Sequence, residues 1–160
     1  MNQTTNVKTY VAYGSNMDLG QMAHRCPGAF PFAKGTVKGY RLLFKGSASG
    51  SYATIESCEG AEVPVLLWSI DLRHERALDR YEGFPTFYQK ETVTVETERG
   101  AIEGMAYVMD PSRPFGEPTE WYYGVLERAY ERFGFDKAIL EQALDDSMAE
   151  AGRAAFRRAV

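Results

Sequence analysis

Apolar and polar residues follow patterns typical of β-strands over much of the chain. In segment 88–98, Val93 and Val95 alternate with threonines, and after a turn at Arg99-Gly100 the chain returns through 102–109, which predicts a β-hairpin. Segment 63–70 is apolar at nearly every position, as expected for a strand buried on both faces. Four further short strands are predicted at 7–13, 30–37, 39–45 and 52–56.

Helical segments are marked by helix formers between capping residues. Asp71 and Gly83 bound one of them, 72–82. The others are 19–24, a helix opened by Thr119 and Glu120 that runs to 133, and a last helix after Asp136. Strands and helices are mixed without a regular βαβ succession. The pattern therefore predicts an α+β protein, in which a small mixed or antiparallel sheet, open or curled into a barrel, carries helices on its outside.

Size and charge narrow the class of protein. A chain of 160 residues that is 44% hydrophobic is long enough for one domain, 1–160, with a substantial core. A net charge of −4 argues against a broad nucleic-acid surface and leaves room only for a local basic patch. No apolar run approaches a membrane span, and the N-terminal segment 1–8 has no apolar stretch of signal-peptide type. We therefore expect a soluble, cytoplasmic protein that acts without a membrane; its oligomeric state is left open.

Cysteine and histidine do not form a metal-site pattern. Cys26 and Cys58 lack a disulfide framework spacing, so reduced, partly buried thiols are expected, and nothing supports a cysteine nucleophile. His24 lies too close to Cys26, and His74 has no paired ligand, so neither a metal nor another cofactor is predicted. His74 lies on the helix face opposite Leu78 and is predicted to be solvated.

The first candidate site is the junction between strand 7–13 and helix 19–24. Gly14 breaks the strand, and Ser15 and Asn16 favour turns and helix caps. Such a junction presents backbone N–H groups at the positive end of a helix dipole, which suits a carboxylate or a developing oxyanion. A plain strand-to-helix turn would have the same local sequence, so this segment alone leaves both interpretations open.

The second candidate is Glu82 at the end of helix 72–82. It shares a helix face with Leu78 and Tyr81, so it points toward the core if Leu78 does. Burial and the negative end of the dipole would both raise its pKa toward the range of a general base. The alternative is a half-exposed glutamate paired with Arg80 or Lys90.

Taken together, these segments resemble a known family. Y-G-S-N-M at 13–17 resembles the Y-G-S-N-L signature of the γ-glutamylcyclotransferase superfamily, with Met17 in place of leucine. The segments A-T-I at 53–55, L-D-R-Y-E-G at 78–83 followed by Tyr88, and P-T-E-W-Y at 118–122 fit the family pattern in the same order. The resemblance covers about residues 7–135, whereas the Ala/Arg-rich end after Gly152 has no counterpart.

The resemblance implies a fold, an activity and a set of site residues. It implies a mixed β-barrel with flanking helices and an enzyme that cyclises the γ-glutamyl group of a small γ-glutamyl amino acid, amine or peptide to 5-oxoproline. Glu82 would be the base and then the acid, without metal or cofactor, and Tyr13, Gly14, Ser15 and Asn16 would bind the glutamyl head.

Two tyrosines and one alternative function complete this picture. Tyr88 and Tyr122 would wall the pocket, although tyrosines at a barrel rim are as often core residues; Tyr107 is expected in the core. The alternative function is a non-catalytic binding module that keeps the pocket for a small γ-glutamyl-like ligand. The presence of Glu82 argues against it, because loss of the base is the simplest way to lose the activity.

Overall fold

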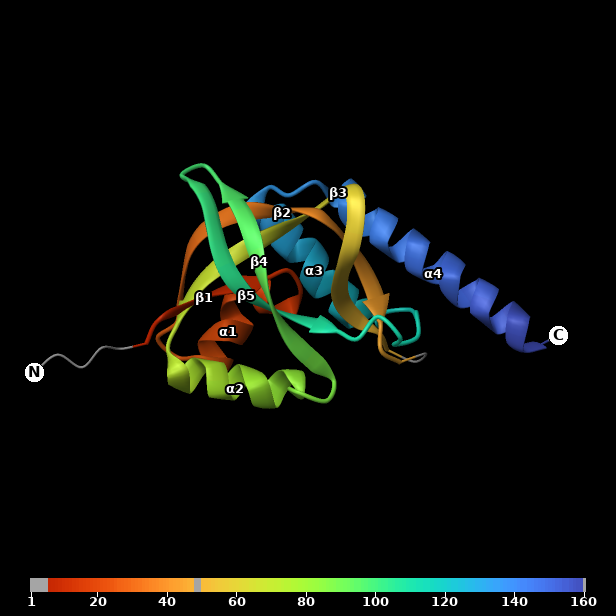
Figure 1. Cartoon of the computed structure of the whole chain (residues 1–160), viewed down its shortest axis with the longest axis horizontal. Coiled ribbons are helices and arrows are strands. Elements are labelled where there is room, and N and C mark those ends of the chain that lie inside the picture. Colours follow the sequence, from red (N-terminus) through yellow and green to blue (C-terminus); the bar gives the residue numbers. More distant parts are fainter. Residues whose placement is uncertain (1–5, 48–49, 160) are drawn as a thin grey trace, which may run out of the picture.

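A closed five-stranded barrel forms the centre of the computed structural model, which describes residues 6–47 and 50–159 (Figure 1). Its strands follow the order β1-β3-β2-β4-β5 around the barrel. The β1–β5 pair is parallel and the other pairs are antiparallel, so the barrel is mixed, as the resemblance predicted. The strands are β1 (Lys8–Ala12), β2 (Phe30–Lys45), β3 (Tyr52–Ile70), β4 (Tyr88–Thr97) and β5 (Gly100–Met109).

Four of the predicted short strands are in fact parts of two long ones. Segments 30–37 and 39–45 join as β2, and segments 52–56 and 63–70 join as β3. The pairing of β2 with β3 shifts register between Lys38 and Tyr40, where Gly39 has φ +80° and Gly60 of β3 has φ +84°. Glycine adopts a positive φ without steric cost, so these residues bend the strands and do not end them.

Two glycines allow neighbouring strands to approach closely where the barrel closes. A Cβ on Gly35 of β2 would lie 2.4 Å from Val95 Cγ1 of β4, and a Cβ on Gly104 of β5 would lie 2.7 Å from Val11 Cγ2 of β1. These are the β2–β4 and β1–β5 seams, where Thr36 pairs with Glu96 and Tyr10 pairs with Met105. Any larger residue at either glycine would hold the two strands apart.

The helices lie outside the barrel and begin and end at the predicted caps. They are a 3₁₀ helix η1 (Ser15–Met17), α1 (Leu19–Arg25), α2 (Leu72–Glu82), α3 (Glu120–Phe133) and α4 (Lys137–Ala159). Asp18, Asp71 and Thr119 accept hydrogen bonds from the first turns of α1, α2 and α3. Gly83 and Gly134 end α2 and α3 in the left-handed conformation, as expected for helix C-caps. In Figure 1, α2 lies across one end of the barrel and α4 extends beyond the barrel.

The prediction that His74 is solvated is wrong. His74 is 6% exposed, and its Nε2 lies 2.7 Å from the carbonyl oxygen of Pro27, just after α1. Its Nδ1 accepts the backbone N–H of Asp71 and completes a capping box. His74 precedes Leu78 by four residues, so the two side chains share the inner face of α2, and the prediction placed His74 on the wrong face.

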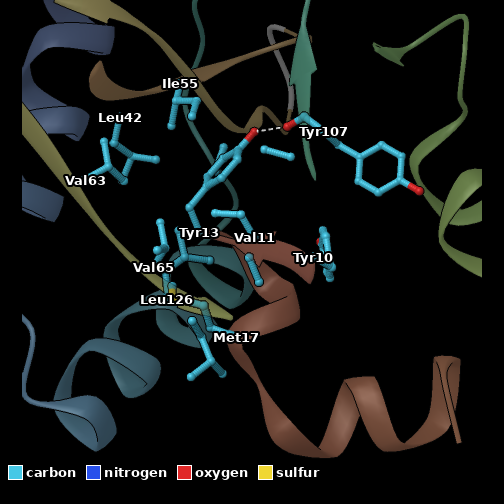
Figure 2. Packing of buried hydrophobic residues seen from close by; sticks show 14 of the residues in the cluster. Tyr10, Val11, Tyr13, Met17, Leu42, Ile55, Val63, Val65, Tyr107 and Leu126 are labelled. Carbon is cyan, nitrogen blue, oxygen red and sulfur yellow. Dashed lines mark hydrogen bonds between the residues drawn. The ribbon is translucent and has the colours of Figure 1, made fainter. Parts of the chain in front are cut away.

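The barrel interior is apolar and leads directly to a tyrosine-rich region. Figure 2 shows Leu42, Ile55, Val63 and Val65 packed in the core, with the Tyr13 hydroxyl donating to the carbonyl of Tyr107. Tyr107 is buried, as predicted, and its ring points away from Tyr13 (Figure 2).

The two cysteines are free, with Cys26 buried and Cys58 partly exposed, as expected from their spacing. No helix within the described ranges is long and apolar enough to cross a membrane. Most of the N-terminal segment considered for a signal peptide, residues 1–5, lies outside the described residues.

Candidate active site

A cavity of about 310 Å³ opens between the β1–η1 junction and the C-terminal end of α2. All seven residues predicted for a site from the sequence line it: Tyr13, Gly14, Ser15, Asn16, Glu82, Tyr88 and Tyr122. Tyr10, Tyr52, Ala53, Arg80, Tyr81, Gly83, Phe87 and Tyr107 complete the wall. The fold thus brings together segments that are far apart in the chain.

Glu82 reaches this cavity because α2 ends there. Leu78 is fully buried and fixes the inner face of the helix, while Glu82, one turn later, is half-buried in the cavity wall. The left-handed cap at Gly83 turns the chain away immediately after Glu82.

Asn16 connects Glu82 to the opposite side of the cavity. Its amide nitrogen lies 3.3 Å from Glu82 Oε1 and 2.9 Å from the Tyr10 hydroxyl, and its amide oxygen lies 2.6 Å from Arg25 Nη1. A guanidinium can only donate, so the amide oxygen must face Arg25 and the NH₂ group must face Glu82. Asn16 is 2% exposed, and its orientation is therefore determined by Arg25.

The carboxyl of Glu82 has an unusual proton affinity. Burial raises its pKa from 4.5 to about 7, and the positive charge of Arg25 acts in the opposite direction. The alternative that Glu82 pairs with Arg80 or Lys90 is wrong, since within the described chain Lys90 bridges Glu75 and Asp79. Glu82 can therefore exchange a proton near neutral pH, which is the property a general acid–base group needs.

Tyr88 and Tyr122 meet the same backbone residue. The Tyr88 hydroxyl donates to the carbonyl of Ala53 at 2.7 Å, and the Tyr122 hydroxyl accepts the N–H of Ala53 at 3.1 Å. Burial raises the pKa of both phenols, so both stay protonated at neutral pH. The two side chains are thus buried and line the cavity at once.

The junction at 14–16 is tightly packed against one of these tyrosines. A Cβ on Gly14 would lie 3.1 Å from the Tyr122 hydroxyl and 3.5 Å from the Cβ of Ala53. Gly14 has φ −119°, so a side chain at this position would be limited by the nearby Tyr122 hydroxyl and not by a left-handed backbone. The first hydrogen bond of η1 is donated by the Met17 N–H to the Gly14 carbonyl. The N–H groups of Ser15 and Asn16, two residues of the cavity lining, come earlier in the chain and have no partner within this helix.

Several cavity residues were missed by sequence reasoning. Tyr10 was placed only within the strand 7–13, and Arg25, which does not line the cavity but contacts Asn16 in its wall, was given no role. Arg25 also lies 3.6 Å from the centre of the Tyr81 ring, and Gln21 accepts its second guanidinium nitrogen at 2.7 Å. The available signal was its position at the end of α1, which returns toward Asn16.

Metal ligands do not gather in the described part of the chain. Within residues 6–47 and 50–159, no three His, Cys, Asp or Glu side chains are grouped as they would be around a metal ion.

A family model described as γ-glutamyl cyclotransferase, AIG2-like, matches residues 10–130. The chain belongs to this family. The match includes the β1–η1 junction, all of α2 and Tyr122, and hence every residue placed around the cavity above.

Solved structures share the family fold. One described as a γ-glutamyl cyclotransferase is 25% identical, with a TM-score of 0.74 over 86% of each chain. An uncharacterized protein from Homo sapiens is 26% identical, with the same TM-score and coverage. A yeast γ-glutamyl cyclotransferase described as specific to glutathione is 11% identical, with a TM-score of 0.61 over 91% of this chain and 96% of the other, and shows the fold alone. No curated protein matches the chain.

Proposed function

We propose that this protein is a γ-glutamylcyclotransferase that converts the γ-glutamyl group of a small γ-glutamyl amino acid, amine or peptide to 5-oxoproline. The observation that carries the proposal is Glu82, a carboxyl with a pKa of about 7 in the wall of a tyrosine-lined cavity. Membership in the family supports the reaction type, and the cavity supports a small-molecule substrate.

The substrate supplies its own nucleophile. The α-amine of a γ-glutamyl compound attacks the γ-carbonyl carbon, a new C–N bond closes the five-membered lactam, and the original amide C–N bond breaks to release the amine. At pH 7 the α-amine is an ammonium and cannot attack. Glu82 takes one proton from this ammonium and transfers it to the nitrogen of the leaving amine, so it ends in its starting state. The second proton, which the α-nitrogen loses on becoming the lactam N–H, goes to the released amine, which leaves as an ammonium.

The main task of the remaining cavity is to hold one folded conformer of the glutamyl chain. Positioning of tethered groups can lower a barrier by up to ~7–11 kcal/mol. Tyr88 and Tyr122 restrict the shape of the cavity, since their hydroxyls are fixed on Ala53. The N–H group of Asn16 serves the carboxylate of the glutamyl head or the oxyanion at the γ-carbon, whereas that of Ser15 faces the Tyr122 hydroxyl. Asn16 orients the Glu82 carboxylate through its amide.

The test is release of 5-oxoproline from a panel of γ-glutamyl amino acids, amines and peptides by the parent protein and by Glu82→Gln. Glutamine keeps the shape of the side chain and removes its proton-accepting function, so kcat should fall by about 10²-fold or more. Glu103→Gln is the matched control, because Glu103 is exposed on β5 and lies outside the cavity lining. Near-parent turnover by Glu82→Gln would exclude Glu82 as the base.

The binding-module alternative predicts a different result in the same experiment. In that case calorimetry would show 5-oxoproline binding to the parent protein, while no member of the panel would release 5-oxoproline. Turnover of any panel member that depends on Glu82 excludes the alternative.

A further inference from the structure

The arginine and lysine side chains around the cavity differ in whether they have a protein partner. Arg25 bonds to Asn16 and Gln21, Lys90 bridges two carboxylates, and Arg113 donates to the Thr86 carbonyl and stacks on Phe87. Each of these cations therefore has a structural task. Arg80 does not. It is an exposed residue of the cavity lining, and its side chain forms no hydrogen bond, ion pair or ring contact with any residue in 6–47 and 50–159.

The position of Arg80 places its charge on the open side of the cavity. It precedes Glu82 by two residues on the last turn of α2, and the rings of Tyr52 and Tyr81 on the same wall are 45% and 47% exposed. Tyr10, Tyr13, Tyr88 and Tyr122, in contrast, are nearly buried and form the inner end. Arg80 and Glu82 are the two ionisable side chains of the lining other than tyrosine.

The direction of the substrate in such a cavity follows from the reaction. The glutamyl head must fold so that its α-amine and the scissile amide nitrogen both lie near Glu82, because Glu82 exchanges protons with both. The buried end accepts this compact head, and the rest of the leaving group must extend toward the open side. A leaving group that is an amino acid or a peptide carries a carboxylate there, whereas a simple amine does not.

We propose that Arg80 forms a carboxylate subsite at the cavity mouth, which makes the protein prefer γ-glutamyl amino acids and peptides over γ-glutamyl amines. A guanidinium without a protein partner can bind a carboxylate through two parallel hydrogen bonds. The inference rests on the proposed function and names the class of its leaving group.

The test compares two substrates that differ by one carboxylate, γ-glutamyl-L-alanine and γ-glutamylethylamine. For the parent protein, kcat/KM for the alanine compound should exceed that for the ethylamine compound about tenfold, the range of a partly solvated, charge-assisted contact. Arg80→Gln should lower this ratio about tenfold, mainly through the alanine compound. Raising the ionic strength should reduce the preference of the parent protein, because the contact is near solvent.

Matched variants separate a specific contact from a general charge effect. Arg76→Gln removes the same charge one turn earlier on α2, at an exposed residue outside the cavity lining, and should leave the ratio unchanged. Arg80→Glu should reverse the preference and favour γ-glutamyl-ethylenediamine, whose leaving group is cationic.

The outcomes distinguish this inference from the proposed function. If both substrates are turned over and Arg80→Gln leaves their ratio unchanged, or lowers both equally, the subsite is wrong while the activity stands. If the parent protein turns over neither substrate, the proposed function fails. Calorimetric Kd values for the same two compounds then decide the subsite, which requires tighter binding of the alanine compound by the parent protein but not by Arg80→Gln.

Discussion

Two glutamates on α2 have opposite proton affinities although both are withdrawn from solvent. Glu75, in the first turn, lies 2.8 Å from Lys90 Nζ and 3.0 Å from Lys8 Nζ. Burial by itself would raise the pKa of Glu75, but the hydrogen bonds from Lys90 and Lys8 bring it below its usual value. Glu82, in the last turn, has the neutral amide of Asn16 as its hydrogen-bond partner among the described residues, and burial raises its pKa to about 7.

The comparison shows what separates a structural carboxylate from a reactive one on the same helix. Burial disfavours the charged form in both cases, and a cation within hydrogen-bonding distance reverses this only at Glu75. The helix dipole adds to the contrast, because it favours a negative charge in the first turn and disfavours it in the last. Glu75 therefore anchors α2 to the barrel, whereas Glu82 remains available for proton transfer.

The largest expected effect comes from removing the partner of Glu75. Lys90→Met should lower the free energy of unfolding at pH 7 by about 2–3 kcal/mol, since a buried carboxylate loses its shortest ion pair. The folded-state pKa of Glu75 lies below its usual value, so ionised Glu75 stabilises the folded protein at neutral pH. This contribution is lost as the pH falls and Glu75 is protonated. The difference between variant and parent should therefore shrink toward pH 4, as measured by urea unfolding at both pH values.

The matched control for this prediction is Lys137→Met. Lys137 forms an ion pair with Glu131 on the surface, where the two side chains are 44% and 59% exposed. Its loss should cost less than about 1 kcal/mol. Equal losses for the two variants would mean that the buried position of Glu75 has no special importance.

A second variant should increase the difference in pKa between Glu75 and Glu82. Arg25→Gln removes the positive charge that lowers the pKa of Glu82, so this pKa should rise above about 7. At pH 7 a smaller fraction of Glu82 would then be ionised, and kcat/KM for 5-oxoproline release should fall about tenfold, with its acid limb moved to higher pH.

Arg25→Lys separates charge from orientation at this position. It keeps the charge but cannot hold Asn16, Gln21 and the Tyr81 ring as the guanidinium does. The acid limb should stay near the parent position while kcat falls. If Arg25→Gln lowers kcat without moving the limb, Arg25 does not affect the protonation of Glu82.

The smallest expected effect is a gain in stability. The raised pKa means that folded Glu82 holds its proton more tightly than the unfolded chain does, so the parent protein should lose stability as the pH rises from about 4.5 to about 7. The full shift would correspond to about 3 kcal/mol, but Glu82 is only half-buried and water screens its charge. Glu82→Gln avoids this loss and should therefore become more stable relative to the parent by about 1 kcal/mol over that interval. Urea unfolding at pH 4.5 and 8 measures the change, and a pH-independent difference would contradict it.

Local sequence patterns predicted the ends of elements better than their extent. The caps at Asp71, Gly83 and Thr119 were identified because capping depends on neighbouring residues. The long strands were divided at Gly39 and near Gly60, because glycine can equally end a strand or bend it. Only the pairing of β2 with β3 decides between these outcomes.

The candidate site shows the same limit. The residues 13–16, Glu82, Tyr88 and Tyr122 were found because they lie in short segments with recognisable chemistry, and the fold places them around one cavity. Arg25 and Arg80 were not assigned to the site. Their importance depends on what they contact in three dimensions: Arg25 fixes the Asn16 amide, and Arg80 has no protein partner among the described residues.

The central claim is that Glu82 exchanges its proton near neutral pH, and a carboxyl titration tests it directly. Carbon-13 NMR of the glutamate-labelled protein, with Glu82→Gln to assign the signal, reports the protonation of this side chain without a substrate. The contrast between the two glutamates predicts a midpoint at about pH 7 for Glu82 and below the usual value for Glu75. A Glu82 midpoint near 4.5 would mean that its carboxyl is an ordinary surface group and would contradict the claim.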